Sequence, residues 1–406
     1  MAFQEYRYKV ELSYIHKSKE TKITPESIKF IHIDSDYLGK KAFPIIFLGV
    51  NLEFEVYKNM ISNMKEDTVV FALTKYIVDE NNSGVVETKI VKDEFLYFFD
   101  KSNIGEDEDT AEADESEHVS SADQAIRSLN LKLGLINLSI LNMCKEIQND
   151  VLTGNMSSIL YYYLKRGNKV IMEPLDNNKS FTNIIIPPIP TINRLLEYLN
   201  NICSFYNSSY RFFIDLNKNV YLLSNSGNGV ETKDSKYSSI MIKSSGDSSN
   251  ASTKEPGIEI DTKNKCYNIY LDTSNTFTNI NLYKDKEVNK IITISSNGVI
   301  KQSKLDTSNN AKGTRTSIYR IFNENNNEIN NIKNLIEAEK VMLTISKAGV
   351  DCSIVTPEKS INVTNSKVYK EYDGKYILAG KQESFIMNDG ENFTCTTTLK
   401  LLRIKS

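Results

Sequence analysis

Three polar residues at alternate positions are the clearest candidates for metal binding. His32, Asp34 and Asp36 stand two residues apart in the stretch Phe30–Asp36, so a strand would place all three on one face. Imidazole and carboxylate groups are common metal ligands. No second cluster of such residues accompanies them in the sequence. We therefore interpret them as the solvated face of a strand rather than as a metal site.

Other patterns that could carry chemistry are weak. The glycine-rich stretch Asn225–Gly229 lacks the Lys-Ser/Thr ending of a phosphate-binding loop, and we interpret it as a mobile loop. Carboxylates are plentiful, so a glycosidase pair stays open, but nothing marks out two of them and tryptophan is absent. The sequence thus predicts no catalytic, cofactor-binding or metal-binding residue.

The cysteines also lack a reactive pattern. They are scattered, odd in number and without zinc-like spacing. This predicts reduced thiols buried as small apolar groups in a chain made in the cytosol. The five residues are Cys144, Cys203, Cys266, Cys352 and Cys395.

Length and charge limit the classes of protein that remain. A chain of 406 residues predicts about two to four domains, since single cores rarely grow larger. A net charge of −3 argues against a protein whose main function is to bind the phosphates of nucleic acid. The N-terminus lacks a signal-peptide pattern, and the longest apolar run, Phe43–Val50, is too short to cross a membrane.

Residues 1–100 are predicted to form a first small β-barrel domain. Short β-branched and aromatic runs follow one another closely, which is typical of barrels. The segment Val56–Met64 reads as a short helix or loop between them. The expected strands are Tyr6–Leu12, Phe30–Asp36, Phe43–Val50, Thr68–Val78 and Val85–Phe99.

Residues 101–124 are predicted to be an acidic linker or surface loop. Gly105–Glu117 holds eight acidic residues and no bulky apolar one, so it repels itself and stays solvated. An acidic segment that binds a partner remains the alternative.

Residues 125–255 are predicted to be a mixed α/β domain with a polar insertion at 225–253. The helices expected are Leu129–Gln148, Ser157–Leu164 and Ile192–Cys203, the last with Thr191 as its N-cap. Tyr210–Asp215 and Val220–Ser224 form a hairpin. In Tyr161–Tyr163 we expect one or two buried rings rather than a stacking platform.

Residues 256–406 are predicted to be a second β-barrel domain with inserted loops. Phe393–Ile404 alternates apolar and polar residues, and the turn signal Asn388–Gly390 precedes it. The fold class is therefore mainly β with an α+β insert, in which two small β-barrels form a pseudo-repeat around a mixed α/β region. Further segments are expected to be strands (Gly257–Asp261, Cys266–Leu271, Ile291–Ser295), a loop (Asn323–Asn331) and a helix (Lys333–Lys340).

Three parts of the chain together resemble a known family. They are Pro174–Pro188 with the helix after it, Tyr210–Leu216 with Val220–Leu223, and Tyr372–Leu378 with Phe393–Leu399. The combination resembles the baseplate hub protein of contractile phage tails and phage-tail-like bacteriocins, to which late control protein D and the base of type VI secretion spikes are similar. The resemblance covers 125–225 and 340–406 well, and 1–100 by architecture only.

What the resemblance implies is a structural adaptor without an active site. Three chains would form a ring whose six barrels meet a hexameric tail tube on one face and a trimeric central spike on the other. A tape measure protein and a LysM-type baseplate protein are further implied partners, and no membrane or specific nucleic acid is involved. The chain would be synthesised in the bacterial cytoplasm and assembled into the tail baseplate.

The expected contact surfaces are strands of the two barrels, and edge strands would pair with or abut neighbouring barrels. Phe43–Val50, Val85–Phe99 and Phe393–Ile404 are the strands chosen. Two alternatives stay open. A tail-associated cell-wall hydrolase would lyse peptidoglycan in a zymogram, and a receptor-binding or carbohydrate-binding tail protein would bind glycans through an exposed aromatic cleft.

Overall fold

The structure is a computed structural model that describes most of the chain and divides it into two compact units. The first unit comprises residues 1–34, 44–141 and 382–396, and the second comprises 35–43, 142–381 and 397–406. The described residues are 5–38, 41–78, 86–100, 128–147, 149–207, 210–225, 230, 237–244, 257–271, 276–279, 288–295, 297–304, 315–321, 340–345, 352–364, 370–389 and 392–404.

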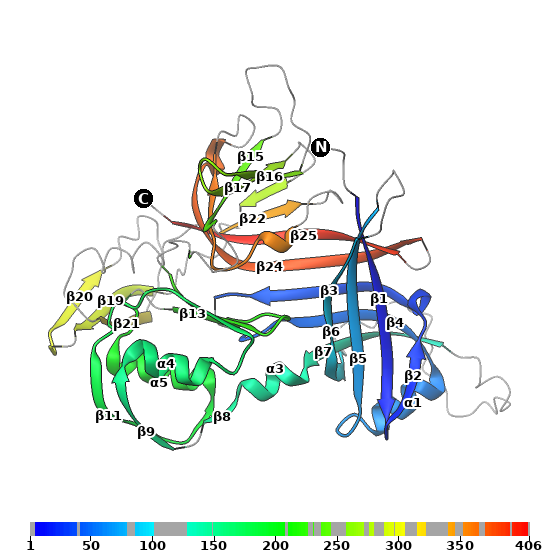
Figure 1. Cartoon of the computed structure of the whole chain (residues 1–406), viewed down its shortest axis with the longest axis horizontal. Helices are drawn as coiled ribbons and strands as arrows, with labels where there is room; N and C mark the ends of the chain where they lie inside the picture. Colours follow the sequence, from blue (N-terminus) through cyan, green and yellow to red (C-terminus); the bar gives the residue numbers. More distant parts are fainter. Residues whose placement is uncertain are drawn as a thin grey trace. The chain divides into compact units, whose positions relative to one another are not determined.

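The first unit is built on a closed eight-stranded β-barrel (Figure 1). Its strands follow one another in the order β24-β3-β4-β7-β6-β5-β1-β25, and a pairing between β24 and β25 closes the ring. The mainly β fold class predicted from the sequence is confirmed. The strands are β1 (Glu5–His16), β3 (Ile28–Asp36), β4 (Ile45–Glu53), β5 (Thr68–Val78), β6 (Val86–Phe99), β7 (Ser128–Asn137), β24 (Gly374–Asp389) and β25 (Asn392–Ile404).

Period-two alternation explains why these segments pair. Along β3, Ile31, Ile33 and Ser35 are buried, while His32 and Asp34 between them are only partly buried. β1 runs antiparallel to β5 in unbroken register from Glu5↔Val78 to Ile15↔Thr68. Every second side chain therefore fills the barrel interior, and the ladder satisfies the backbone groups. Three short elements accompany the barrel: β2 (Lys19–Ile23), paired with β1, the 3₁₀ turn η1 (Pro25–Ser27), and helix α1 (Phe54–Ser62), where the sequence predicted a helix or loop.

The barrel draws on more of the chain than residues 1–100, because β7 and the C-terminal hairpin complete it. β24 and β25 lie between β3 and β1 in the strand order. Tyr8 of β1 stands opposite Phe393 of β25, and its ring meets Phe385 of β24 edge-on at 4.9 Å between centroids. The predicted strand Phe393–Ile404 is confirmed as nearly the whole of β25.

The helix predicted over Leu129–Gln148 is confirmed only over Leu138–Met143 and is wrong on either side. Residues 128–137 form β7, which pairs with β4 and β6, and only Leu138–Met143 (α3) is helical before β8 (Lys145–Ile147). Leucines at 129, 131, 133 and 135 have the period of a strand, and two partner strands stabilise that pattern more than a local helical preference can.

The second unit carries another run of eight strands around the same hairpin. Its order is β16-β17-β15-β23-β24-β25-β22-β18, and no described pairing joins its two ends. Its core includes Ile240, Ile269, Ile361, Tyr376 and Leu399. The additional strands are β15 (Ser239–Ser244), β16 (Gly257–Asp261), β17 (Cys266–Leu271), β18 (Thr276–Asn279), β22 (Lys340–Ile345) and β23 (Ser360–Val363), with 3₁₀ turns η4 (Cys352–Ile354) and η5 (Lys370–Tyr372).

Helices and small sheets make up the rest of the second unit, as expected for its mixed α/β part. α5 (Ile192–Cys203) begins where predicted, and the Thr191 side chain accepts a hydrogen bond from the Arg194 N–H as its N-cap. No described helix is long and apolar enough to cross a membrane. The other elements are α4 (Met156–Leu164), β9 (Asp150–Asn155), β10 (Lys169–Met172), β11 (Ser180–Ile186), β12 (Ile189–Thr191), β13 (Tyr210–Ile214), β14 (Asn219–Ser224), β19 (Val288–Ser295), β20 (Ile300–Lys304) and β21 (Arg315–Ile321).

Some sequence predictions fall outside the described residues. They are the acidic linker 101–124 with its run Gly105–Glu117, most of the polar insertion 225–253 including nearly all of the glycine-rich stretch Asn225–Gly229, the loop Asn323–Asn331 and nearly all of the helix Lys333–Lys340. These remain predictions.

Candidate assembly surfaces

The three strands chosen as contact surfaces correspond to β4, β6 and β25, and all three belong to the closed barrel. β4 pairs with β3 and β7, and β6 pairs with β5 and β7. β25 has β1, β22 and β24 as partners. In the described part of the barrel, edge-to-edge pairing with a neighbour is therefore not available to these strands. Contacts must use outward side chains and strand ends instead.

The outward side of β3, β4, β6 and β7 is covered by aromatic rings. The Phe30 ring lies over Gly49, and a Cβ atom added at that glycine would come within 2.2 Å of it. The Phe98 ring lies over Gly134 in the same way, also at 2.2 Å. Phe47, on the same side, meets the Phe98 ring edge-on at 6.2 Å. Because glycine has no side chain, the two rings can pack directly against the backbone of the sheet. This gives the outer face of the barrel an ordered surface. We call Phe30, Phe47 and Phe98 the outer aromatic face.

A cation borders the outer aromatic face. The Lys132 ammonium lies 4.8 Å from the centroid of the Phe47 ring and 2.9 Å from the Asp100 carboxylate. His32 lies beside Phe30, with 6.0 Å between ring centroids. The face thus combines aromatic rings, which are enriched in the cores of protein interfaces, with one ion pair at its border, where interfaces are more polar.

The structure places the His32 ring against side chains of β24. Its Nδ1 lies 2.8 Å from Ser384 Oγ, and its Nε2 lies 3.4 Å from the Gln382 amide nitrogen. Both ring nitrogens therefore face β24 side chains. Among the described residues, no group of three or more potential ligands is placed to hold a metal ion.

A Tyr-His-Asp cluster with a buried carboxylate is the feature of the barrel that most resembles a catalytic site. Asp67, 4% exposed, accepts a hydrogen bond from the Tyr14 hydroxyl, and its Oδ2 lies 2.7 Å from His16 Nδ1. The Tyr97 hydroxyl donates to the Met60 carbonyl at 2.7 Å. Burial raises the pKa of Tyr97 to about 12, with Asp67 acting in the same direction. Burial and Asp67 also raise the pKa of Tyr14.

These raised pKa values keep both hydroxyls protonated at neutral pH, so neither is an activated nucleophile or base. The cluster ties β1 to the turn before β5. Sequence reasoning missed it, because His16 and Asp67 lie 51 residues apart with no shared motif.

Two of the cysteines are also unsuited to nucleophilic chemistry. All five are free, and only Cys395 is not buried. Burial raises the pKa of Cys144 and of Cys203 to about 11 in each case. A thiolate at neutral pH is therefore disfavoured at both positions.

Buried charges in the second unit hold strands together. Arg211, 4% exposed, donates to the carbonyls of Leu378 (3.2 Å) and Ser224 (3.4 Å). Glu173 accepts the Ser224 N–H at 2.7 Å. Burial lowers the pKa of Arg211 to about 10, against the opposite influence of Glu173 and Glu358, so it stays charged at neutral pH. Breaking such a network by removing one partner is costly, which marks it as structural.

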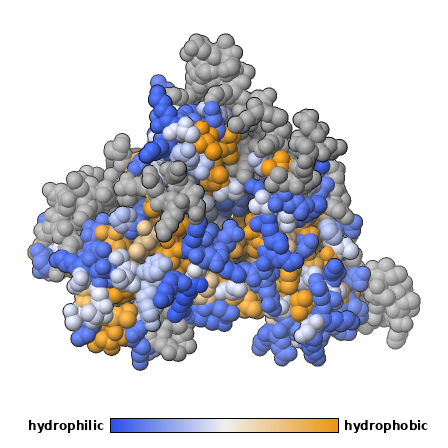
Figure 2. Space-filling model, in the orientation of Figure 1, coloured by the Kyte–Doolittle hydropathy of each residue, from blue (hydrophilic) through white to orange (hydrophobic). Residues whose placement is uncertain are grey.

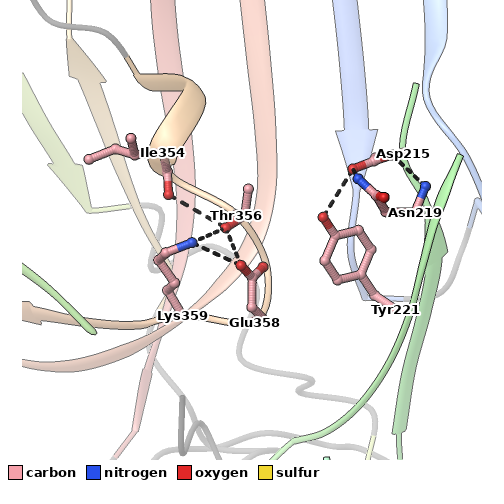
Figure 3. A network of polar contacts seen from close by, with 7 residues as sticks. All are labelled: Asp215, Asn219, Tyr221, Ile354, Thr356, Glu358 and Lys359. Atoms are coloured by element: carbon pink, nitrogen blue, oxygen red, sulfur yellow. Dashed lines mark hydrogen bonds and ion pairs between the residues drawn. The ribbon is translucent and has the colours of Figure 1, made fainter. Parts of the chain in front are cut away.

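Two further polar networks stabilise turns (Figure 3). In one, the Lys359 ammonium lies 2.8 Å from the Glu358 carboxylate and 2.6 Å from the Thr356 hydroxyl. In the other, Asp215 accepts bonds from the Asn219 amide and the Tyr221 hydroxyl. Burial raises the pKa of Asp215, while these bonds oppose the rise. Neither network pairs two acids in the manner of a glycosidase.

Apolar surface is exposed on one two-stranded sheet, formed by β9 and β11, and on helix α4 of the second unit. Val151 of β9 and Ile185 of β11 are cross-strand partners, 59% and 66% exposed, and Figure 2 shows a hydrophobic patch over this strand pair. On α4, Tyr161 and Tyr162 are 52% and 48% exposed while Tyr163 is buried. The expectation that one or two of these rings are buried is confirmed.

Comparison with known proteins finds one family and several similar solved structures. A family model described as "Bacteriophage PBS1 gene 109 protein" matches residues 3–404. A tail protein from Neisseria meningitidis is similar at 12% identity and a TM-score of 0.46, covering 97% of each chain. The 43 kDa tail protein of prophage MuSo2 from Shewanella oneidensis has 10% identity and a TM-score of 0.42, with 98% of this chain and 97% of that chain covered.

A Francisella PdpA–VgrG complex is also similar, at 9% identity and a TM-score of 0.44, over 99% of this chain and 58% of that chain. No curated protein matches the sequence.

Proposed function

Because the chain belongs to the Bacteriophage PBS1 gene 109 protein family, whose model spans residues 3–404, we propose that it is a structural protein of a phage tail. More specifically, it is the baseplate hub of a contractile injection system, a homotrimer that joins the hexameric tail tube to the trimeric central spike. The tube and spike proteins are its main partners, and it carries out no catalysis.

The observation that carries this proposal is the closed barrel with its outer aromatic face. A closed barrel has no free strand edge that could pair with another chain. Its contacts with neighbouring proteins must therefore be made by outward side chains. Phe30 and Phe98 are fixed over Gly49 and Gly134, which gives a preformed surface that needs little ordering on binding. A ring of subunits needs such surfaces.

The second unit supports the expected pseudo-repeat. Both units contain eight strands in sequence around β24 and β25. Two similar sheets in each of three chains would present six similar units to a tube of sixfold symmetry. The second barrel at 256–406 and the domain limits given above form part of this proposal.

The polar clusters support a structural rather than an enzymatic role. Burial keeps Tyr14 and Tyr97 protonated and disfavours the Cys144 and Cys203 thiolates. Arg211 and Glu173 are bonded to backbone groups that hold strands together. These interactions support a role for these groups in stabilising the fold rather than in binding a substrate.

The test is the position and copy number of the chain in assembled particles. We expect sedimentation of the pure protein to give a mass three times 46.2 kDa. We expect electron cryo-microscopy of purified tails to place three copies between tube and spike. A pure protein that clears peptidoglycan in a zymogram, or particles that lack the chain, would exclude the hub assignment.

A further inference from the structure

The first barrel is closed between β1 and β25 by very little backbone pairing. Tyr8 and Phe393 are the residue pair that joins these two strands, and among the described residues the ladder continues to neither neighbour of Phe393. On its other edge, β1 pairs with β5 without a break along Glu5–Ile15. We call the boundary between β1 and β25 the seam of the first barrel.

A second strand shares the edge of β1 on which the seam lies. Because β5 takes the other edge, β2 and β25 must both lie on this one. β2 pairs with Leu12–His16, which leaves β25 only the earlier part of β1. Backbone hydrogen bonds therefore contribute less across the seam than between β1 and either of its other partners.

Side chains hold the seam instead. Tyr8 and Phe393 are 8% and 0% exposed, and the Tyr8 ring meets the Phe385 ring of β24 edge-on at 4.9 Å between centroids. The Tyr76 hydroxyl of β5 donates to Asn392 Oδ1 of β25 at 2.6 Å. Because β1 lies between β5 and β25 in the strand order, this hydrogen bond spans the seam. The closed form thus depends on packed rings and on the Tyr76 hydroxyl.

The other strand of the hairpin is attached to β3. β24 pairs with β3. The His32 ring of β3 also lies 2.8 Å from Ser384 Oγ and 3.4 Å from the Gln382 amide nitrogen, both on β24. We propose that the first barrel opens at its seam, where β25 separates from β1 while β24 stays paired with β3.

The seam is the boundary at which opening disrupts the least backbone pairing. Opening there breaks the pair Tyr8↔Phe393, whereas separating β4 from β7 would break a ladder along the whole of Ile46–Glu53. Folded proteins open locally in units that differ widely in free energy, and units with few buried hydrogen bonds open most easily.

Opening of the seam changes which backbone groups are available to other proteins. The open form has unpaired edges on β1 and β25, and such edges accept extended segments of other chains. The closed seam blocks this pairing. The opening is a property of the first unit alone and does not depend on the proposed tail function.

The test measures thiol labelling at two buried positions of the full-length chain, in the variants Val10→Cys and Val50→Cys. Val10 on β1 is 3% exposed and lies near the seam, while Val50 on β4 is 1% exposed and lies three strands from β25. Cysteine is close to valine in size, so both variants should fold. Peptide mass analysis separates the introduced thiols from the native ones. We expect the thiol at position 10 to be labelled at least about tenfold faster than the thiol at position 50.

Adding Tyr76→Phe to each cysteine variant removes the hydrogen bond that spans the seam and keeps the ring. We expect labelling at position 10 to become about threefold to tenfold faster, the effect of losing one hydrogen bond, while labelling at position 50 stays unchanged. The matched control is Tyr163→Phe, which removes a hydroxyl that lies 3.4 Å from Asp150 Oδ2 in the second unit. This control should leave labelling at position 10 unchanged.

Two results would overturn the opening at the seam. Equal labelling rates at positions 10 and 50 would mean that the barrel opens as a whole. An equal acceleration at both positions by Tyr76→Phe would mean that the hydroxyl stabilises the entire barrel rather than the seam.

Discussion

His32 and Ser384 lie 352 residues apart in the chain, yet their side chains meet with 2.8 Å between Nδ1 and Oγ. His32 belongs to β3 and Ser384 to β24, so the contact crosses the position where the C-terminal hairpin completes the first barrel. Gln382 approaches the other ring nitrogen at 3.4 Å. Its amide can donate to Nε2 while Nδ1–H donates to Ser384, which is the bonding pattern of a neutral imidazole.

Acidification should therefore weaken the first barrel. Burial lowers the pKa of His32, the Lys132 charge adds to this, and Asp34 acts in the opposite direction. The unfolded chain, with a His pKa of about 6.5, then binds the proton more readily than the folded chain. This contribution to stability is complete above about pH 6.5 and is lost as the pH falls below it. Urea unfolding between about pH 7.5 and about pH 5.5 measures the effect.

The variant His32→Gln isolates the contribution of this residue, because other groups also titrate in that range. Glutamine keeps a hydrogen-bonding group near Ser384 but cannot gain a proton. We expect its unfolding free energy to depend less on pH than that of the unchanged protein. Identical pH dependence of the two proteins would show that His32 does not couple protonation to stability.

Local signals in the sequence were enough to predict many elements of this chain. Thr191 followed by leucines at helical spacing predicts α5 at its observed bounds, and alternation predicts most of β25. The helix cap and the apolar alternation both depend only on residues a few positions apart, so the sequence alone is enough to predict these elements. The hairpin of β13 and β14 is predicted for the same reason.

The features that sequence reasoning missed depend on distant partners. β7 forms because β4 and β6 flank it, although a helix was predicted there. The hydrogen bond from Tyr14 to Asp67 joins residues that share no sequence motif. The same is true of the pairing between β3 and β24. Gly49 and Gly134 are visible as glycines within strands, but only the structure shows which ring covers each.

Replacing Phe385 by alanine should destabilise the first barrel strongly. Phe385 is 2% exposed, and its ring packs against Tyr8 at 4.9 Å. Truncation of a buried phenyl ring costs about 3–5 kcal/mol in unfolding free energy. Hydrogen exchange should accelerate in β1 and β3, the neighbours of the hairpin. Ile386→Ala, at a 57% exposed neighbouring position, is the control and should change stability by less than about 0.5 kcal/mol. Equal effects of the two variants would contradict the buried position of Phe385 against Tyr8 in the first barrel.

The turn between β1 and β2 should be improved by Lys17→Asn together with Ser18→Gly. Both residues have positive φ angles, 47° and 65°, and they join a hairpin that ends at the pair His16↔Lys19. Such two-residue turns favour Asn-Gly because other residues pay a steric cost in the left-handed region. We expect a gain of about 1 kcal/mol, seen as a higher melting temperature. The single variant Lys19→Asn, just outside the turn, should give no gain; if it matches the double variant, the backbone explanation is wrong.

The outer aromatic face makes a prediction about coupling between Gly49 and Phe30. Alanine at position 49 would place its Cβ 2.2 Å from a carbon of the Phe30 ring, so the ring must move. Overpacking of this kind costs about 1–3 kcal/mol. In the double variant G49A/F30A the obstructing ring is gone, and the loss should be smaller than the sum of the two single losses. Urea unfolding of the four proteins in this cycle gives the coupling energy, which we expect to be about 1 kcal/mol or more in favour of the double variant. Additive losses would mean that the ring does not cover the glycine, and the preformed face on which the hub proposal rests would lose its support.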